Sequence, residues 1–179
     1  MAGILDQQGI RNFHEVAGRK DFFRQNLFRV IAFGGANFFS NDDLLYIEST
    51  TLPSRTINNI QVPYMGLQFN VPGTVQYPNS NAWQVTMRMD AGLGIRDKLE
   101  DWQRSIFDDS DSTGDYSIPA GDEGVTTLDL LSKNGNRLRR YHLYGCYITN
   151  LGEMTLNVGT AGEIVTVPAT IAYQYWRVE

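Results

Sequence analysis

Two histidines and one cysteine are the side chains best suited to acid–base or nucleophilic chemistry. His14 lies in a mixed N-terminal stretch, whereas His142 and Cys146 share a segment in which apolar and polar residues alternate. Nucleophilic catalysis needs a base beside the nucleophile, and a metal site usually needs three or four ligands. No such set, and no CxxC, HExxH or GxSxG motif, is present. The pattern predicts a half-buried structural His142, a buried Cys146 thiol, and no catalytic residue, metal or cofactor.

The second chemical feature is an acidic segment, residues 108–124, which holds six acidic and no basic side chains. Clustered carboxylates can bind Ca²⁺, but a calcium loop needs a central glycine and a glutamate at its last position. That spacing is absent, so the segment is interpreted as an acidic surface loop. Without those six acids the remaining 14 acids and 15 bases give a net charge of +1, against −5 for the whole chain. A strongly basic face that would grip nucleic acid is therefore excluded.

Gly92 and Gly94 precede a helical pattern, as glycines do in nucleotide-binding loops. The third glycine and a P-loop lysine are missing, so these glycines are predicted to turn a strand into a helix. Acidic and basic residues share the helix that follows, at spacings of three and four. This spacing is typical of surface ion pairs and does not indicate an acid–base couple.

Two elements stand out in the hydrophobic pattern. Residues 82–90 alternate with a period of two, which predicts a half-buried strand. Residues 93–107 instead repeat at helical spacing, and this amphipathic helix is expected to pack against the sheet through Ile95, Leu99, Trp102 and Ile106. Nearly all other patterned segments alternate by two, so the chain is predicted to be mainly β with one helix.

Further strands are predicted at 26–33, 44–51, 56–62, 64–71, 125–131, 137–149, 154–158 and 164–176. Pro63 is expected to close the third of these, and turns are expected at Pro72-Gly73, Asn134-Gly135 and 159–163. Pro168 predicts an edge position or a bulge. Residues 1–25 are interpreted as an N-terminal arm or short helix. The length of 179 residues fits one domain, and neither a signal peptide nor a membrane-spanning run is visible.

Several motifs then follow one another in a characteristic order: NLFRVIAF, TTLPSRTINNIQVPYMG, NVPGTVQYPNSNAWQVTMRMD, KLEDWQ, YITNLGEMTLNV and EIVTVPATIAYQYW. With these motifs the chain resembles the tail tube proteins of contractile-tailed bacteriophages over residues 24–107 and 141–176. The more specific pieces are Leu52-Pro53, Val62-Pro63 with Gly66, Trp83, Asp101-Trp102-Gln103, residues 150–153 and Tyr175-Trp176. The first 20 residues and the acidic loop do not match.

The resemblance implies an antiparallel β-sandwich or barrel, with one amphipathic α-helix packed on the outside. It also implies that strands from six protomers join into one inner barrel and that the rings stack into a tube. The implied partners are further copies of the chain, a tail sheath protein, a tape-measure protein, and baseplate and tail-terminator proteins. Double-stranded DNA would pass through the lumen without specific binding. The implied location is the virion tail, assembled in the host cytoplasm, with no membrane partner.

If the chain forms such a tube, uncharged polar side chains on the strands are candidates for its lumen, because a lysine-lined bore would retain the phosphates of DNA. The candidate lumen-facing residues are Gln68, Asn70, Gln84, Thr86, Thr166, Thr170 and Gln174. Arg88 is the charged exception and is expected to pair with Asp90 or another neighbour. The candidate ring-to-ring contacts are the N-terminal arm and Leu52, Pro53, Ile57 and Ile60.

Three alternatives stay open. The inner tubes of type VI secretion (the haemolysin-coregulated protein) and of pyocin-like injection machines share this fold but carry other cargo. A ligand-binding β-sandwich module would use its tyrosines to line a groove, although aromatic residues in strands mostly serve packing. An enzyme would need a nucleophile, base and orienting group, which the sequence does not show.

Overall fold

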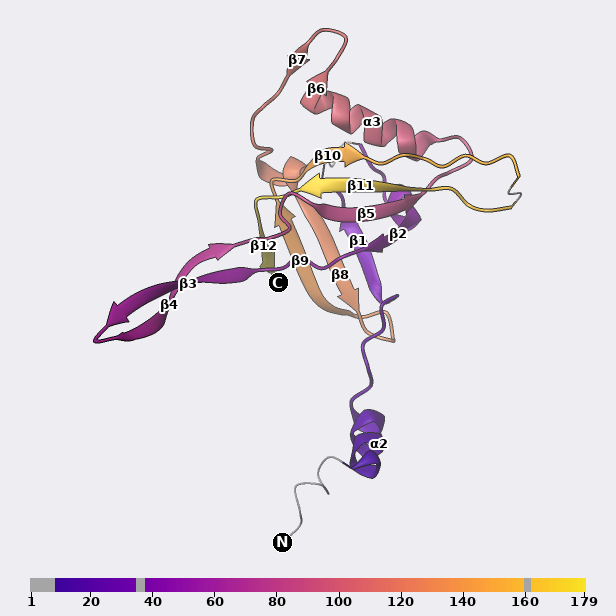
Figure 1. Cartoon of the computed structure of the whole chain (residues 1–179). Coiled ribbons are helices and arrows are strands. Elements are labelled where there is room, and N and C mark those ends of the chain that lie inside the picture. Colours follow the sequence, from indigo (N-terminus) through magenta and orange to yellow (C-terminus); the bar gives the residue numbers. More distant parts are fainter. Residues whose placement is uncertain (1–8, 35–37, 160–161) are drawn as a thin grey trace.

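The computed structural model describes residues 9–34, 38–159 and 162–179. Two four-stranded antiparallel sheets form the body, and the strands of one cross those of the other (Figure 1). The first sheet has the order β1 (Phe28–Ala32), β8 (Thr126–Leu131), β9 (Arg137–Tyr144) and β12 (Tyr175–Val178). The second has the order β10 (Tyr147–Leu151), β11 (Thr166–Ala172), β5 (Trp83–Arg88) and β2 (Ile47–Thr50). The mainly β antiparallel class is therefore confirmed.

The hydrophobic core lies between the two sheets and under one helix. The second sheet supplies every other residue of its two central strands, as the period of two predicts. Its buried members are Trp83, Val85, Met87, Val167, Ala169 and Ile171. The first sheet adds Val30, Leu128 and Leu143 to the same cluster. One face of the second sheet is thus buried in the core, and the side chains between these residues lie on the opposite face of that sheet.

The helix α3 (Gly94–Ile106) covers one side of this core. Ile95, Leu99 and Trp102 are buried in the cluster, and Ile106 is half-buried beside it. The helix begins where Leu93 adopts a left-handed backbone with φ of 56°, and the Asp90 carboxylate accepts hydrogen bonds from the backbone N–H groups of the first turn. The strand-to-helix turn is confirmed.

A second helix, α2 (Ile10–Arg19), lies in the segment interpreted as an arm or short helix, so the expectation of a single helix in the fold was wrong. It lies at the far end of an arm that leaves the body next to β1 (Figure 1). None of its residues is buried. The predicted arm at residues 1–25 therefore contains a helix, and its first eight residues lie outside the described part of the chain.

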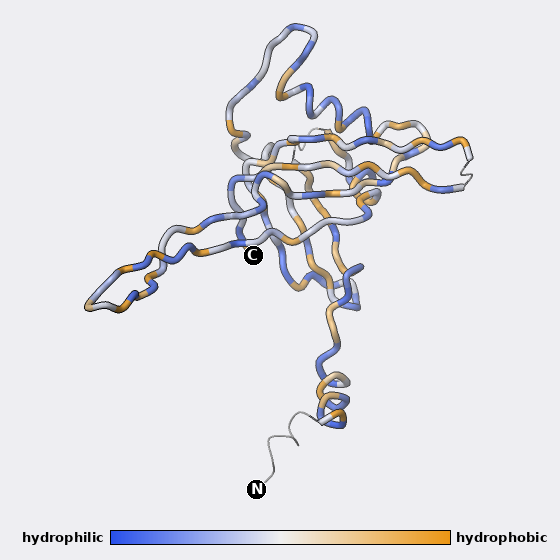
Figure 2. The backbone as a smooth tube through the Cα atoms, viewed as in Figure 1, coloured by the Kyte–Doolittle hydropathy of each residue, from blue (hydrophilic) through white to orange (hydrophobic). Residues whose placement is uncertain are grey.

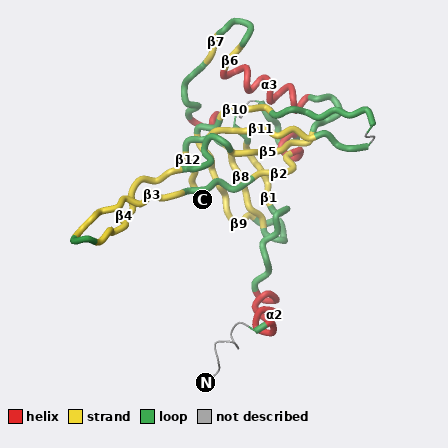
Figure 3. Tube along the Cα trace, in the orientation of Figure 1, coloured by secondary structure: helices red, strands yellow, loops and turns green. Residues whose placement is uncertain are grey.

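A hairpin of β3 (Thr56–Tyr64) and β4 (Leu67–Gln76) projects from the body (Figures 1 and 3). Its turn is at Met65-Gly66, where φ is 48° and 80°. The predictions that Pro63 ends a strand and that Pro72-Gly73 forms a turn were wrong, because both prolines lie inside paired strands. Each strand of an isolated hairpin has an open side, so a proline can lack its N–H there without losing a ladder bond.

Two long predicted strands are broken by bends. Residues 137–149 divide at Gly145, whose φ of 66° sends β9 and β10 into different sheets. Residues 164–176 divide in the same way after β11, so Tyr175 does not share a face with Val167. Alternation alone does not show a change of sheet, because the pattern continues on both sides of the bend.

Pro168 lies in β11 between two neighbouring strands and pairs with Thr86 of β5 in continuous register, so the predicted edge position or bulge was wrong. Its carbonyl accepts a hydrogen bond of 2.7 Å from Gly152 N, just beyond the end of β10. Both main-chain groups of a strand residue point to the same side. The missing N–H of Pro168 therefore points where β10 has ended, and the pairing with β5 is intact.

Of the other predicted turns and strands, some are confirmed and some are wrong. The turn at Asn134-Gly135 is confirmed by hydrogen bonds from Gly135 N to Ser132 O and from Ser132 N to Asn136 O. Residues 154–158 form no strand, and the 44–51 segment begins with a 3₁₀ helix, η1 (Asp43–Tyr46), before β2. The turn predicted at 159–163 lies partly outside the described residues.

The acidic segment consists mostly of loop (Figure 3). It carries three short elements: β6 (Phe107–Asp108), β7 (Thr113–Gly114) and the 3₁₀ helix η2 (Gly121–Gly124). Across the described residues, no helix is long and apolar enough to span a bilayer.

Candidate lumen face and assembly surfaces

The face of the second sheet that is turned away from the core brings four of the predicted lumen residues together. The register pairs Gln84 with Thr170, Thr86 with Pro168, and Arg88 with Thr166. Cross-strand partners lie on the same face of a sheet, and the residues between them are buried in the core. Gln84, Thr86, Thr166 and Thr170 thus form one polar surface, which we call the polar face.

The polar face is lined mainly by hydroxyl and amide groups. The Thr149 hydroxyl donates to the carbonyl of Thr170 at 3.0 Å, and the Thr50 hydroxyl donates to that of Gln84 at 3.3 Å. Arg88 pairs with Glu48, at 3.8 Å between Nε and Oε2, and not with Asp90, which caps α3. The charge of Arg88 is therefore countered locally.

The other three predicted lumen residues lie elsewhere. Gln68 and Asn70 are on β4 of the projecting hairpin, and both are exposed. Gln174 lies in the bend between β11 and β12, where its side chain packs over Gly145. The structure therefore does not bring the seven residues onto one surface.

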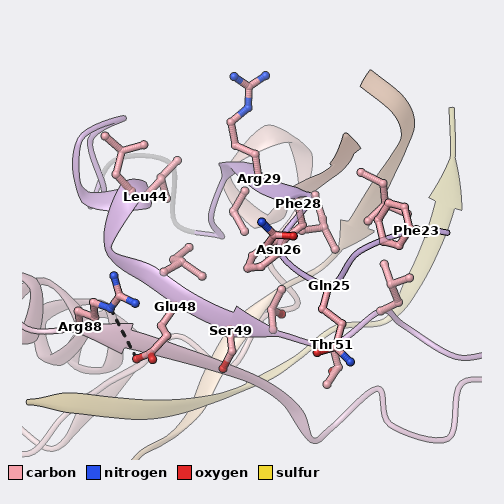
Figure 4. Close-up of a pocket in the computed structure, with 17 residues that line it drawn as sticks. Phe23, Gln25, Asn26, Phe28, Arg29, Leu44, Glu48, Ser49, Thr51 and Arg88 are labelled. Carbon is pink, nitrogen blue, oxygen red and sulfur yellow. Dashed lines mark ion pairs between the residues drawn. The ribbon is translucent and has the colours of Figure 1, made fainter. Parts of the chain in front are cut away.

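Both sheets have open edges. β10 and β2 form the edges of the second sheet, and β1 and β12 form those of the first. An open edge presents unpaired N–H and C=O groups that readily pair with another strand. A groove of about 750 Å³ lies between the edges β1 and β2, with Phe28 and Leu44 on its walls and the Arg88–Glu48 ion pair at one end (Figure 4).

The hairpin carries the predicted ring-to-ring residues Ile57 and Ile60, which are both about half exposed. Leu52 and Pro53 lie in the link that leads to it. Two indole N–H groups hold this link to the body: Trp83 donates to Thr51 O and Trp176 donates to Ser54 O.

The apolar surface of the hairpin is larger than the sequence pattern indicates. It also includes Val62, Tyr64, Met65, Leu67, Phe69, Val71 and Val75. Figure 2 shows apolar and polar residues interleaved along it. The run of alternating residues on both sides of Met65-Gly66 was the available signal. Because Pro63 and Pro72-Gly73 are stronger breaking signals than Met65-Gly66, this run predicts two separate strands with a later turn.

His142 and Cys146, the two side chains with acid–base or nucleophilic groups in the β9–β10 region, are packed among other residues of the fold. His142 is half-buried, with Nδ1 3.1 Å from the Thr127 hydroxyl and Nε2 3.7 Å from a Glu179 oxygen. Cys146 is buried, and burial raises the pKa of its thiol to about 11. Within the described residues, no three His, Cys, Asp or Glu side chains are grouped to hold a metal ion.

The sequence profile described as phage tail tube protein matches residues 22–179, which is most of the chain. The chain belongs to the phage tail tube protein family. The tail tube protein gp19 of Enterobacteria phage T4 is 29% identical over 160 residues, covering 88% of this chain and 92% of the relative. The resemblance stated from the motifs is therefore confirmed, and the chain is a structural tail tube subunit.

Two solved structures share the fold of the tail tube subunit. The first comes from a PVC extracellular contractile injection system, in a sheath–tube complex, with a TM-score of 0.60, 16% identity, and coverage of 92% of this chain and 96% of that chain. The second comes from the sheath/tube terminator of the same system, with a TM-score of 0.61, 16% identity, and coverage of 89% and 98%. At these identities the likeness shows the fold alone.

Proposed function

We infer that six copies of the tail tube subunit close a ring by pairing β2 of each copy with β10 of its neighbour. In this arrangement the whole chain acts as one domain, and the second sheets of six copies join into an inner barrel of roughly 24 strands. A barrel of this size encloses a water-filled bore instead of a packed core. Stacked rings form the hollow tube that conducts the genome into the host while a surrounding sheath contracts.

The observation that carries this proposal is a sheet with two open edges, one buried face and one polar face. Copies joined edge to edge around a six-fold axis satisfy every edge without leaving a free end. The buried face and α3 then lie on the same, outer side of the barrel wall. The polar face is left to line the bore.

The chemistry of the polar face suits a conduit for DNA. Hydroxyl and amide groups do not neutralise phosphates, so double-stranded DNA can move past them without the counterion release that drives tight binding. Gln84, Thr86, Thr166 and Thr170 are the four residues that we place in the bore. Gln68, Asn70 and Gln174 would line it only where the hairpin or the β11–β12 bend reaches the axis.

The implied partners follow from this position in a tail of the contractile type. A sheath protein would contact the outer surface, and a tape-measure protein would fill the bore before the DNA does. Baseplate and tail-terminator proteins would contact the two ends. We place the subunit in the virion tail after assembly in the host cytoplasm, with no membrane partner.

Ring-to-ring contact is assigned to the hairpin, its link and the N-terminal arm. Leu52, Pro53, Ile57 and Ile60 lie on the first two, and the arm extends well beyond the body (Figure 1). Apolar side chains held out in solvent are stabilised when another surface covers them. Deleting residues 1–20 is therefore expected to weaken stacking more than ring formation.

Electron microscopy of the purified protein tests the proposal directly, because it should show hollow six-fold rings or tubes.

Cysteine labelling then tests which residues line the bore. A small polar maleimide should reach Gln84→Cys and Thr170→Cys inside tubes, whereas a maleimide on a carrier wider than the bore should not. Leu138→Cys, an exposed position on β9, is the control. A purified protein that stays monomeric under all conditions, or tubes that admit the wide reagent to Gln84→Cys, would contradict the proposal.

A further inference from the structure

The core face of the first sheet continues beyond the part that its own chain covers. Across β1 and β8, Val30 pairs with Leu128. Two residues further along, Phe28 pairs with Leu130, so all four side chains share one face. The first pair is buried in the core, whereas the second pair is only half-buried. We call the stretch of β1 and β8 that carries Phe28 and Leu130 the overhang.

The overhang forms one wall of the groove of about 750 Å³ that lies between β1 and β2 (Figure 4). Residues 47–50 of the edge strand β2 line the same groove, which we call the β1–β2 groove. The apolar side chains of the overhang therefore border a space that is also bordered by an open strand edge. A strand added to that edge would have to enter this space.

A further groove, of about 510 Å³, lies along the opposite edge of the second sheet. Ile148 and Leu151 of β10 line one side of it, and the paired side chains of Arg96 and Glu100 on α3 line another. Both β10 residues lie on the core face of the sheet, because their partners on β11 are buried. Leu151, like Phe28 and Leu130, is only half-buried.

Pairing β2 of one copy with β10 of the next continues the second sheet without a break. The four strands alternate in direction, so β10 and β2 run opposite ways and form an antiparallel pair. A continuous sheet keeps its buried face on one side, so Ile148 and Leu151 of the added β10 are directed at the overhang. The register places Leu151 level with Thr50 of β2, which lines the β1–β2 groove.

We propose that the overhang of one copy covers the core side of β10 in the next copy, with Phe28 and Leu130 packed against Leu151. The occupant of the β1–β2 groove is thus a second copy of this chain, because the strand that pairs with the β2 edge lies beneath the overhang. The inference rests on the proposed function and deepens it. Copies are then joined in two layers, by main-chain hydrogen bonds in the inner barrel and by apolar packing outside it.

The overhang contact explains why three apolar side chains at the two ends of the second sheet are left half-buried in a single copy. Each of them lies on a core face and lacks cover only on the side where the neighbouring copy is placed. Covering apolar surface stabilises an interface roughly in proportion to the area removed from water. The overhang therefore adds to the stability of the ring and directs β10 to the β2 edge.

Two complementary substitutions test this contact. Leu130→Lys changes the overhang, and Leu151→Glu changes the surface that it covers. Each alone leaves an unpaired charge in the contact, so the fraction of protein in rings should fall at least about tenfold. Leu138→Lys, at an exposed position on β9, is the control and should form rings normally. Thermal melts of the unassembled variants check that each one is folded.

An equimolar mixture of the two variants should form rings again. The variants can alternate around a ring of six copies, so that the introduced lysine meets the introduced glutamate at every second contact. The contacts between them are parental. The ring fraction should therefore return to within about threefold of the parental value.

A disulfide trap supplies a second measurement that needs no buried charge. Leu130→Cys combined with Leu151→Cys should give, on oxidation of assembled rings, covalent multimers up to the hexamer in denaturing gels. Leu138→Cys combined with Leu151→Cys is the matched control and should stay monomeric. The native Cys146 should not react, because it is buried and burial raises the pKa of its thiol to about 11.

The outcomes separate this contact from the proposed function. Absence of rings from the unmodified protein would contradict the proposed function. If the unmodified protein forms rings, then normal assembly of either charged variant, a mixture that does not recover, or the absence of covalent multimers would overturn the overhang contact alone. Where a charged variant does not fold, the disulfide result decides.

Discussion

At the residue scale, a buried carboxylate on β8, that of Asp129, forms a two-bond ion pair with Arg140 of β9. Asp129 is fully buried, and its two oxygens accept bonds of 2.6 and 2.9 Å from the Nε and a terminal nitrogen of Arg140. This bond raises the pKa of Arg140. Arg29 of β1 lies 3.9 Å from the same carboxylate, so the pair ties three neighbouring strands together.

Replacing Asp129 by Asn should therefore destabilise the unassembled subunit strongly. The substitution leaves Arg140 without its counter-charge in a mostly buried site, and such losses cost about 3 kcal/mol of unfolding free energy. Urea unfolding followed by tryptophan fluorescence measures the change. Asp101→Asn is the control, because the Asp101–Arg104 pair is exposed and should be worth less than about 1 kcal/mol. Equal effects of the two substitutions would contradict this account of the pair.

Residues whose position follows from local periodicity were predicted well. Trp83, Val85 and Met87 of β5 are buried, as is Cys146. The Asp129–Arg140 pair was not predicted, because its partners come from different strands and their apposition depends on the register of the β8–β9 hairpin. The turn of this hairpin at Asn134-Gly135 was predicted, but the register beyond it also depends on the β-bulge between Leu130 and Leu131, which the local pattern does not show.

At the element scale, the start of α3 is stabilised by hydrogen bonds to the side chain of Asp90. The N–H groups of Ile95 and Gly94 hydrogen-bond the Asp90 carboxylate and lower its pKa below the ordinary 3.8. Negative charge at a helix N-terminus is also favoured by the helix dipole. Asp90 thus links the end of β5 to the helix that covers the core.

This cap predicts a pH dependence of stability. Because the pKa of Asp90 is lower in the folded chain, its contribution is complete above about pH 3.8 and is lost as the pH falls through the lowered value. Asp90→Asn should therefore be less stable than the parent at pH 7, and the difference should shrink below pH 3.8. Thermal melts across this range check the effect, with Asp111→Asn as the control. A deficit that stays constant down to the lowest pH would contradict the assigned cause.

The hairpin of β3 and β4 belongs to the same scale. Sequence patterning predicted strands in both halves but not their turn, because a Pro-Gly pair signals a turn more strongly than Met-Gly does. A proline is tolerated inside these strands only because they project alone. That isolation is a property of the whole fold, so the local sequence could not reveal it.

Assembly should depend on the apolar surface of this hairpin. Ile57→Thr with Ile60→Thr keeps β-branched residues that suit a strand but removes apolar contact. The subunit should keep its melting temperature, whereas the mean tube length should fall at least about threefold. Electron microscopy gives the lengths, and Leu138→Thr on β9 is the matched control. Tubes of parental length would remove these two residues from the ring-to-ring contact.

At the scale of the whole molecule, the separation of functions between surfaces is the main feature. The buried face and α3 hold the body together, the polar face is free, and the arm and hairpin extend beyond the body (Figures 1 and 2). The family and the β class could be predicted from motif order and alternation. The division of the strands between two sheets depends on the bends at Gly145 and after β11.

A charge placed in the bore should slow the passage of DNA. With the six copies that we propose for each ring, Gln84→Lys would line the tube with lysines that bind phosphates by releasing counterions. Assembly should continue, while the infectivity of phage carrying the substitution should fall by about tenfold or more, with recovery at higher salt. Gln84→Asn is the control. Unchanged infectivity at low salt would show that Gln84 does not face the passing DNA.

A cryo-electron microscopy reconstruction of the assembled tube tests the central claim most directly. It should show six subunits in each ring, main-chain hydrogen bonds between β2 of one copy and β10 of the next, and the side chains of Gln84 and Thr170 directed into the bore. A ring in which both edges remain unpaired, or in which the polar face is turned toward the outside, would contradict the account.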